Sequence, residues 1–152
     1  MIGSSIPIID LAPYRDSSVD THQTAQAIRE ACKNVGFFYV KNHGVPEELV
    51  QSIFAKSVKC FKLSREEKRE IRMEMAERAW RGYYEIGEER TNGKVDYQEG
   101  IYLGREQDES DPRVINKVPL HGRNLYPKQL PELKRDIQEW LQEMNRLGAL
   151  LM

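Results

Sequence analysis

Three histidines supply every imidazole of the chain, so they are the first residues to weigh as metal ligands or general bases. They are His22, His43 and His121. A non-haem Fe(II) site of the two-histidine, one-carboxylate kind needs its three ligands on adjacent coordination positions. The residues that follow these histidines are Gln-Thr, Gly-Val and Gly-Arg, so none of them begins an H-x-D pair. The sequence therefore predicts no metal site and no catalytic residue in this chain.

His43 raises the sharpest question, because it ends the β-prone stretch GFFYVKNHGVP of residues 36–46. The Gly44-Val45-Pro46 that follows is typical of a turn that leads into a helix. We therefore interpret His43 as a structural histidine, hydrogen-bonded near this turn, and not as a ligand. Nucleotide-binding glycine motifs and the G-x-S-x-G nucleophile motif are both missing from the sequence.

The two cysteines, Cys32 and Cys60, are far apart, and neither belongs to a C-x-x-C pair. This spacing disfavours zinc and redox motifs and suits a reducing compartment. We expect both cysteines to be small buried hydrophobic residues.

The composition of the chain limits the kinds of function that it can have. The chain has 152 residues, 39% of them hydrophobic and 31% charged, as suits one domain. Its 23 Lys and Arg balance 24 Asp and Glu, which leaves no charge excess to attract nucleic acid or an anionic membrane. No apolar run reaches the roughly 20 residues of a membrane span, and the N-terminus lacks the pattern of a signal peptide. We expect a cytoplasmic protein with no nucleic-acid or membrane partner.

The first elements can be predicted from local patterns. The run IPIIDL of residues 6–11 indicates a short edge strand. Asp20, with Gln23 three residues later, is expected to cap a helix that Gly36 ends. The run FFYV that follows is the best strand candidate of the chain. The apolar residues of the helix recur at helical spacing: Ile28, Ala31, Cys32 and Val35.

Two further helices are expected after Pro46. The first begins there and buries a face made of Val50, Ile53, Phe54, Val58 and Phe61. Ser64 and Glu67 form the capping box of the second, a charged helix through about residue 79 with a Glu74 to Arg78 pair. Its apolar residues are Ile71, Met75 and Ala79.

The pattern changes from Arg81 to Gly104, where two β-like runs flank Asn92-Gly93, a strong hairpin signal. Residues 105–127 predict a long irregular loop. Pro131 then opens a regular helix that has no stop signal, so we expect the sequence to be cut within it. The apolar face of this helix consists of Leu133, Ile137, Trp140, Leu141, Met144, Leu147 and Leu151.

The order of five motifs carries a family resemblance. They are IPIIDL, GFFYVKNHGVP, FKLSREEK, RGYYEIGEERTNGKVDYQEGIYLG and PLHGRNLYP. From Ile6 to Met152 the chain resembles the N-terminal region of the Fe(II)/2-oxoglutarate-dependent dioxygenases of the isopenicillin N synthase-like family. The resemblance implies an α+β fold, a mainly helical front region with a few short strands and a hairpin. Such a region normally packs on a double-stranded β-helix, or jelly roll. That β-helix is expected to be absent here, so residues 1–152 form one N-terminal domain, truncated before the catalytic domain.

The same resemblance implies the chemistry of the intact enzyme. Fe(II) would be held by an H-x-D pair and a distal histidine, and 2-oxoglutarate by an R-x-S pair, all downstream of this chain. Oxidative decarboxylation of 2-oxoglutarate with O2 would drive hydroxylation, desaturation or ring closure of a small organic substrate. This chain would bind neither cofactor and would be inactive without its partner, the missing catalytic β-helix half. The alternative is a non-catalytic scaffold or interaction module derived from the same family.

The segment WRGYYEIG matches the part of the family that runs near the active-site mouth. By this resemblance Arg81, Tyr83 and Tyr84 are candidates for substrate contact, with Arg81 suited to a carboxylate because of its planar fork. Alternation along a strand puts Tyr83 and Tyr84 on opposite faces, so at most one of them is expected to face a pocket. Packing or hairpin hydrogen bonds are the alternative role of all three.

Overall fold

The computed structural model describes residues 5–16 and 18–152. The chain divides into two compact units. A smaller unit takes in Met1–Pro46 and Asn145–Met152, and a larger unit takes in Glu47–Met144. Each unit has a hydrophobic core of its own. The combination of helices with a few short strands confirms the predicted α+β class.

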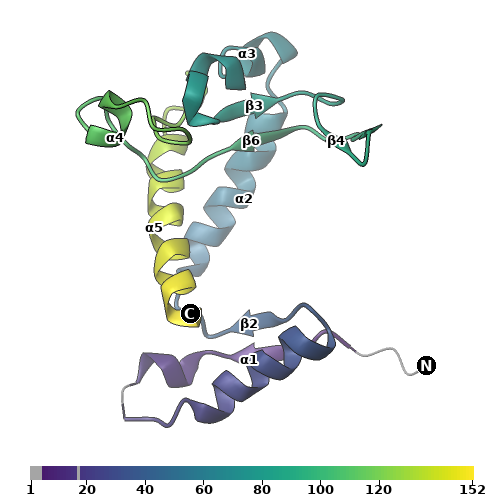
Figure 1. The fold of residues 1–152 in the computed structure, drawn as a ribbon, viewed down its shortest axis with the longest axis vertical. Helices are drawn as coiled ribbons and strands as arrows, with labels where there is room; N and C mark the ends of the chain where they lie inside the picture. Colours follow the sequence, from purple (N-terminus) through teal and green to yellow (C-terminus); the bar gives the residue numbers. More distant parts are fainter. Residues whose placement is uncertain (1–4, 17) are drawn as a thin grey trace. The chain divides into compact units, whose positions relative to one another are not determined.

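The smaller unit is built on a short parallel sheet. Strand β1 (Ile8–Asp10) pairs in parallel with β2 (Tyr39–Lys41), with Ile9 opposite Val40. The 3-10 helix η1 (Ala12–Arg15) and helix α1 (His22–Asn34) lie between the two strands in the chain (Figure 1). The strand predicted within residues 6–11 is thereby confirmed. The core of the smaller unit consists of Ile9, Leu11 and Ala31, against which Tyr14, Ile28, Phe38, Val40, Leu147 and Leu151 pack.

Helix α1 ends as predicted but begins differently. Gly36 has a φ of +87° and its N–H donates to the carbonyl of Ala31, the left-handed arrangement that ends a helix. The N-cap residue is Thr21, not Asp20, and its side chain makes no capping hydrogen bond. Asp20 accepts from the backbone N–H of His22 at 2.9 Å, so it holds the approach to the helix. Cys32 is exposed, against prediction, because the face of α1 that meets the sheet is the one carrying Ala31 and Ile28.

Two helices frame the core of the larger unit (Figure 1). They are α2 (Glu47–Phe61) and residues 133–144 of α5 (Leu133–Leu151). Asp136 of α5 accepts hydrogen bonds from Ser52 and Lys56 of α2, which ties the two helices together. The core consists of Cys60, Leu133 and Ile137, against which Ile53, Leu63, Ile101, Leu103, Tyr126, Leu130 and Leu141 pack.

The apolar face predicted for α2 is only partly right. Ile53 packs in the core, whereas Phe54 is 68% exposed and Val58 54% exposed. The buried residues of α2 are Leu49 and Cys60. The apolar surface of this helix is wider than the stripe covered by its core neighbours, which leaves the side of Phe54 and Val58 open in this structure.

The capping box of Ser64 is confirmed, but the long helix predicted after it is wrong. Ser64 Oγ accepts from the N–H of Glu67 at 3.2 Å, and Glu67 accepts from the N–H of Ser64 at 2.8 Å. Helix α3 (Arg65–Arg69) then ends, and a kinked 3-10 segment, η2 (Met73–Ala79), follows. Glu74 pairs with Arg72 at 3.4 Å, where we predicted Arg78.

The β-like runs of residues 81–104 form two antiparallel pairs. Strand β3 (Gly82–Tyr84) pairs with β6 (Gly100–Tyr102), and β4 (Arg90–Thr91) pairs with β5 (Lys94–Val95). Asn92 and Gly93 connect β4 to β5 with φ values of +52° and +79°, as a type I′ hairpin turn requires, which confirms the predicted hairpin.

The segment predicted as an irregular loop contains one short helix, α4 (Pro112–Ile115), capped by the side chain of Asp111. Among the described residues, no helix has both the length and the apolar character needed to cross a membrane.

Candidate functional site

Strand β3 runs unusually close to the end of α3. Gly82 has a φ of +111°, and a Cβ atom there would lie 2.4 Å from the carbonyl oxygen of Ile71. The same carbonyl accepts the N–H of Tyr83 at 2.8 Å. Only glycine permits this approach, because any other side chain would collide with backbone. The glycine of the WRGYY motif therefore sets the position of Arg81, Tyr83 and Tyr84.

Tyr83 points into the protein. It is 3% exposed, and its hydroxyl donates to Glu99 Oε2 at 2.5 Å. The same carboxylate oxygen accepts from Lys68 Nζ at 2.7 Å, and Lys68 Nζ lies 5.4 Å from the centroid of the Tyr83 ring. Burial first, and then the adjacent Glu99, raises the pKa of Tyr83 far above its usual value. Tyr83 is thus a neutral hydrogen-bond donor within a buried polar cluster.

Tyr84 packs against Tyr102 on the opposite strand. Their ring centroids are 5.1 Å apart, and the hydroxyl of Tyr102 donates to Glu89. This hydrogen bond, together with burial, raises the pKa of Tyr102 to about 12. A Cβ at Gly100 would lie 2.4 Å from the Tyr84 hydroxyl, so this glycine leaves room for the ring.

Tyr84 also lines a cavity of about 460 Å³, which we call the aromatic-acid cavity. Two of its lining residues have positive φ values, Glu77 at +48° and Trp80 at +56°. Such conformations cost on the order of 1–3 kcal/mol for residues other than glycine and cluster at functional sites. The lining consists of Met73, Glu74, Glu77, Trp80, Tyr84, Glu88 and Glu89.

Arg81 lies apart from this cavity. Its Nη2 donates to the carbonyl of Leu120 at 3.2 Å, while its buried Nε has no hydrogen-bond partner among the described residues. Gly104 accommodates the guanidinium, because a Cβ there would lie 1.9 Å from Nη1. Burial lowers the pKa of Arg81, and the nearby Glu106 partly opposes that shift.

The three candidates from the sequence therefore occupy three environments. Tyr84 reaches the aromatic-acid cavity, Tyr83 is committed to Glu99, and Arg81 is held at Leu120. Sequence reasoning missed Trp80, which lines the cavity and is 59% exposed. The signal that could have found it was its place in the same WRGYY motif, directly before Arg81.

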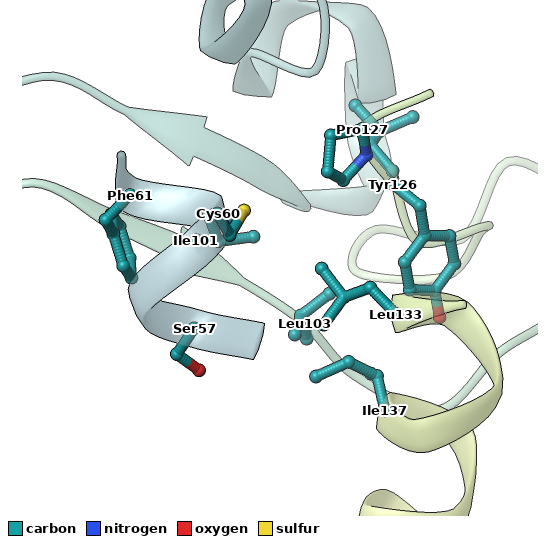
Figure 2. Close-up of a pocket in the computed structure, with 10 residues that line it drawn as sticks. Ser57, Cys60, Phe61, Ile101, Leu103, Tyr126, Pro127, Leu133 and Ile137 are labelled. Carbon is teal, nitrogen blue, oxygen red and sulfur yellow. The ribbon is translucent and has the colours of Figure 1, made fainter. Parts of the chain in front are cut away.

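A second, smaller cavity lies in the core of the larger unit. Its volume is about 120 Å³, and Leu103, Leu133 and Ile137 project into it (Figure 2). Cys60 also lines it, and burial raises the pKa of the Cys60 thiol. Because its walls are mostly aliphatic and aromatic, this space is a packing defect of the core more than a place for chemistry.

The described residues do not form an iron site. They contain no group of three or more His, Cys, Asp or Glu side chains that could hold a metal ion. His43 Nδ1 accepts the N–H of Val45 at 3.1 Å, which confirms its predicted role in the turn. His22 is the first residue of α1, and His121 Nδ1 lies 2.8 Å from the carbonyl oxygen of Pro119.

The chain is similar in sequence to a known protein family and to several known proteins. Residues 6–129 match the family described as "non-haem dioxygenase in morphine synthesis N-terminal". A probable iron/ascorbate oxidoreductase of Dictyostelium discoideum is 39% identical over 157 residues, which is 97% of this chain and 43% of that protein. The 1-aminocyclopropane-1-carboxylate oxidase of Dictyostelium mucoroides is 39% identical over 145 residues, 94% of this chain and 39% of that protein.

Solved structures show a similar fold. A full-length protein of Neurospora crassa, crystallised in complex with alpha-KG, has a TM-score of 0.73 and 25% identity over 97% of this chain and 45% of its own. The chain thus spans less than half the length of the proteins it matches.

Proposed function

The chain belongs to the family of non-haem dioxygenase N-terminal domains, and from this premise we propose that it forms the front portion of a non-haem Fe(II)- and 2-oxoglutarate-dependent oxidoreductase. The enzyme would use O2 to hydroxylate, desaturate or cyclise a small organic substrate. The observation that carries the proposal is the match of nearly the whole chain to the front part of longer oxygenases, in sequence and in fold.

The cofactors belong to the rest of such an enzyme. The donor groups of the described residues do not fit iron, so no step of the reaction can be assigned to them. When bound, Fe(II) and 2-oxoglutarate would activate O2 for attack on a C–H bond, with O2 as the oxidant and 2-oxoglutarate as the co-substrate that is oxidised to succinate and CO2. We propose that this chain binds neither of them and is inactive alone, and that its partner is a catalytic β-helix half. We place the protein in the cytoplasm, where its two free cysteines would stay reduced.

The role of this chain would be to form part of the substrate site. Tyr84 is the stronger tyrosine candidate, because it lines a cavity whereas the hydroxyl of Tyr83 is already bonded to Glu99. Arg81 is a candidate for binding a substrate carboxylate, because the planar fork of its guanidinium suits such a group. Tyr83 would act as the support that holds β3 in place.

The test is an assay of 2-oxoglutarate turnover, in which NMR measures the succinate that is formed. We expect no succinate above the buffer blank from this chain with Fe(II) and ascorbate. We expect turnover when the chain is joined to a catalytic β-helix domain of the family. Turnover by the chain alone would contradict the proposal. So would a joined protein that binds iron but never decarboxylates 2-oxoglutarate, an outcome that favours a non-catalytic module.

The joined protein also tests the substrate site. Tyr84→Phe and Arg81→Lys are expected to raise KM for the substrate, with KM for 2-oxoglutarate unchanged. Tyr97→Phe is the matched control, because Tyr97 is 89% exposed and lies outside the cavity lining.

A further inference from the structure

We propose that the aromatic-acid cavity binds an organic cation, the ammonium or guanidinium group of a small molecule. The inference deepens the proposed function and rests on it, because such a cation would be a group carried by the substrate. Its support is the lining of the cavity, its charge and its size.

The aromatic rings are the first support. Trp80 and Tyr84 both line the cavity, and the faces of these rings attract cations within about 6 Å of their centroids. Trp80 remains 59% exposed although it is the largest side chain of the lining. Its left-handed backbone, with φ +56° and ψ +48°, is that of the residue that ends η2, so Trp80 lies at the turn between η2 and β3.

The charge of the lining is the second support. Glu74, Glu77, Glu88 and Glu89 contribute carboxylates, and none of the lining residues is basic. The partners of these carboxylates leave much of the negative charge uncompensated. Glu88 accepts from the backbone N–H of Glu85, and Glu89 accepts from Tyr102 and Gln98.

Only one of these carboxylates has a cationic partner among the described residues. Glu74 pairs with the half-exposed Arg72 at 3.4 Å, while Glu77 has no hydrogen-bond or ion-pair partner in the described part of the chain. A cavity with this charge and aromatic walls should favour a positively charged guest over a neutral one of the same shape.

Size decides between a metal ion and an organic cation. The carboxylates are not gathered closely enough to form a metal-binding group in the described residues. The volume of about 460 Å³ lies within the usual range of small-molecule sites and would be too large for a bare ion. A methylated ammonium or a guanidinium fills such a space and meets both the rings and the carboxylates.

The test compares choline with its neutral isostere, 3,3-dimethyl-1-butanol, on the iron-free chain at low salt. A Trp140→Phe background leaves Trp80 as the only tryptophan, since the chain has two. Choline and agmatine should each change the Trp80 fluorescence in a saturable way that weakens with added salt, and the neutral alcohol should not. Equal responses to choline and the alcohol would overturn the proposal.

Variants assign the binding to this cavity, with calorimetry as the readout because it does not need Trp80. Glu77→Gln is expected to weaken choline binding about two- to fivefold, and Trp80→Leu to weaken it at least as much. Glu66→Gln, an exposed glutamate of α3 outside the lining, should leave the affinity unchanged. Wild-type affinity in a folded Trp80→Leu variant, checked by circular dichroism, would refute the site.

The two proposals fail separately. Loss of cation binding in this assay would overturn the cation site alone, since succinate formation by the joined protein decides the oxygenase function. Cation binding without succinate formation would overturn the oxygenase function and leave the cation site in place.

Discussion

Tyr83 and Glu99 share a 2.5 Å hydrogen bond, in which the buried phenol of β3 donates to a carboxylate that also receives Lys68. The three side chains come from α3, β3 and the approach to β6, and Lys68 itself is buried. A largely buried cluster of this kind, with Glu99 partly exposed, is stable only while each polar group keeps its partners. It therefore links the strand of the candidate site to the preceding helix.

Replacing Tyr83 by Phe should lower the free energy of unfolding by about 1–3 kcal/mol. The variant keeps the ring in place but removes one hydrogen bond to a partly buried carboxylate. Urea unfolding followed by far-UV circular dichroism measures the change. Tyr97→Phe, at an 89% exposed position, should leave the stability unchanged. Equal stability of the Tyr83→Phe variant would show that the cluster does not hold β3.

Acid should destabilise the larger unit through Glu99. Burial raises the pKa of Glu99, but the hydrogen bonds from Lys68 and Tyr83 outweigh it, so the net pKa lies below the usual value of 4.5. A carboxyl group with a lowered pKa in the folded state stabilises above its unfolded pKa, and that contribution is lost as pH falls through the folded value. Asp136, whose pKa is lowered by its hydrogen bonds from Lys56 and Ser52, acts in the same direction from a usual value of 3.8.

The urea midpoint should therefore decrease as pH falls from about 5 to 2. Glu99→Gln should start from a lower midpoint at neutral pH and show a shallower decrease, because one of the titrating groups is gone. An acid dependence as steep in Glu99→Gln as in the wild type would contradict the assignment to this residue.

Two glycine substitutions should have opposite effects on stability. Gly82→Ala should destabilise the protein by about 2 kcal/mol or more, since its Cβ would meet the Ile71 carbonyl at 2.4 Å and its φ is +111°. Gly148→Ala should stabilise by about 0.5–1 kcal/mol, because this residue lies inside α5 with nothing within 4 Å of the new Cβ. Thermal melting of both variants tests the pair, and a tolerated Gly82→Ala would refute the close approach of β3 to Ile71.

The two thiols should react at very different rates. Cys32 is exposed, whereas Cys60 is 2% exposed and has a pKa raised by burial. Because the thiolate is the reactive form, Ellman's reagent should label Cys32 quickly and Cys60 only as the protein unfolds. In Cys32→Ser the fast phase should vanish and the slow one remain. A fast phase retained in that variant would show that Cys60 is accessible.

Features that depend on a few neighbouring residues could be predicted from the sequence. Ser64 and Glu67 form their capping box within four residues, and Asn92-Gly93 set the hairpin turn by their own φ preferences. Gly36 ends α1 for the same kind of reason. The alternation that separates Tyr83 from Tyr84 was also predictable, because it is a property of any strand.

The environment of each side chain depended on long-range packing. The charged run that begins with α3 stops being helical after Arg69. The carbonyl of Ile71 then accepts a hydrogen bond from the N–H of Tyr83, twelve positions later. Cys32 and Cys60 have similar local patterns, yet only Cys60 meets Leu133 and Ile137 of a distant helix. Burial of a side chain depends on the segment that packs over it, and the spacing of apolar residues along a helix or strand does not identify that segment.

The family and the order of most elements followed from the amino-acid sequence, and the WRGYY motif as a candidate for substrate contact was a prediction from the sequence as well. Folding in three dimensions was needed to direct Tyr83 to Glu99, to place Tyr84 beside Trp80 and to gather four glutamates around them. The two kinds of feature differ in how far apart in the sequence the interacting residues lie. Backbone turns and caps are set by hydrogen bonds between near neighbours, whereas a cavity and its charge arise from segments that meet only when the chain folds.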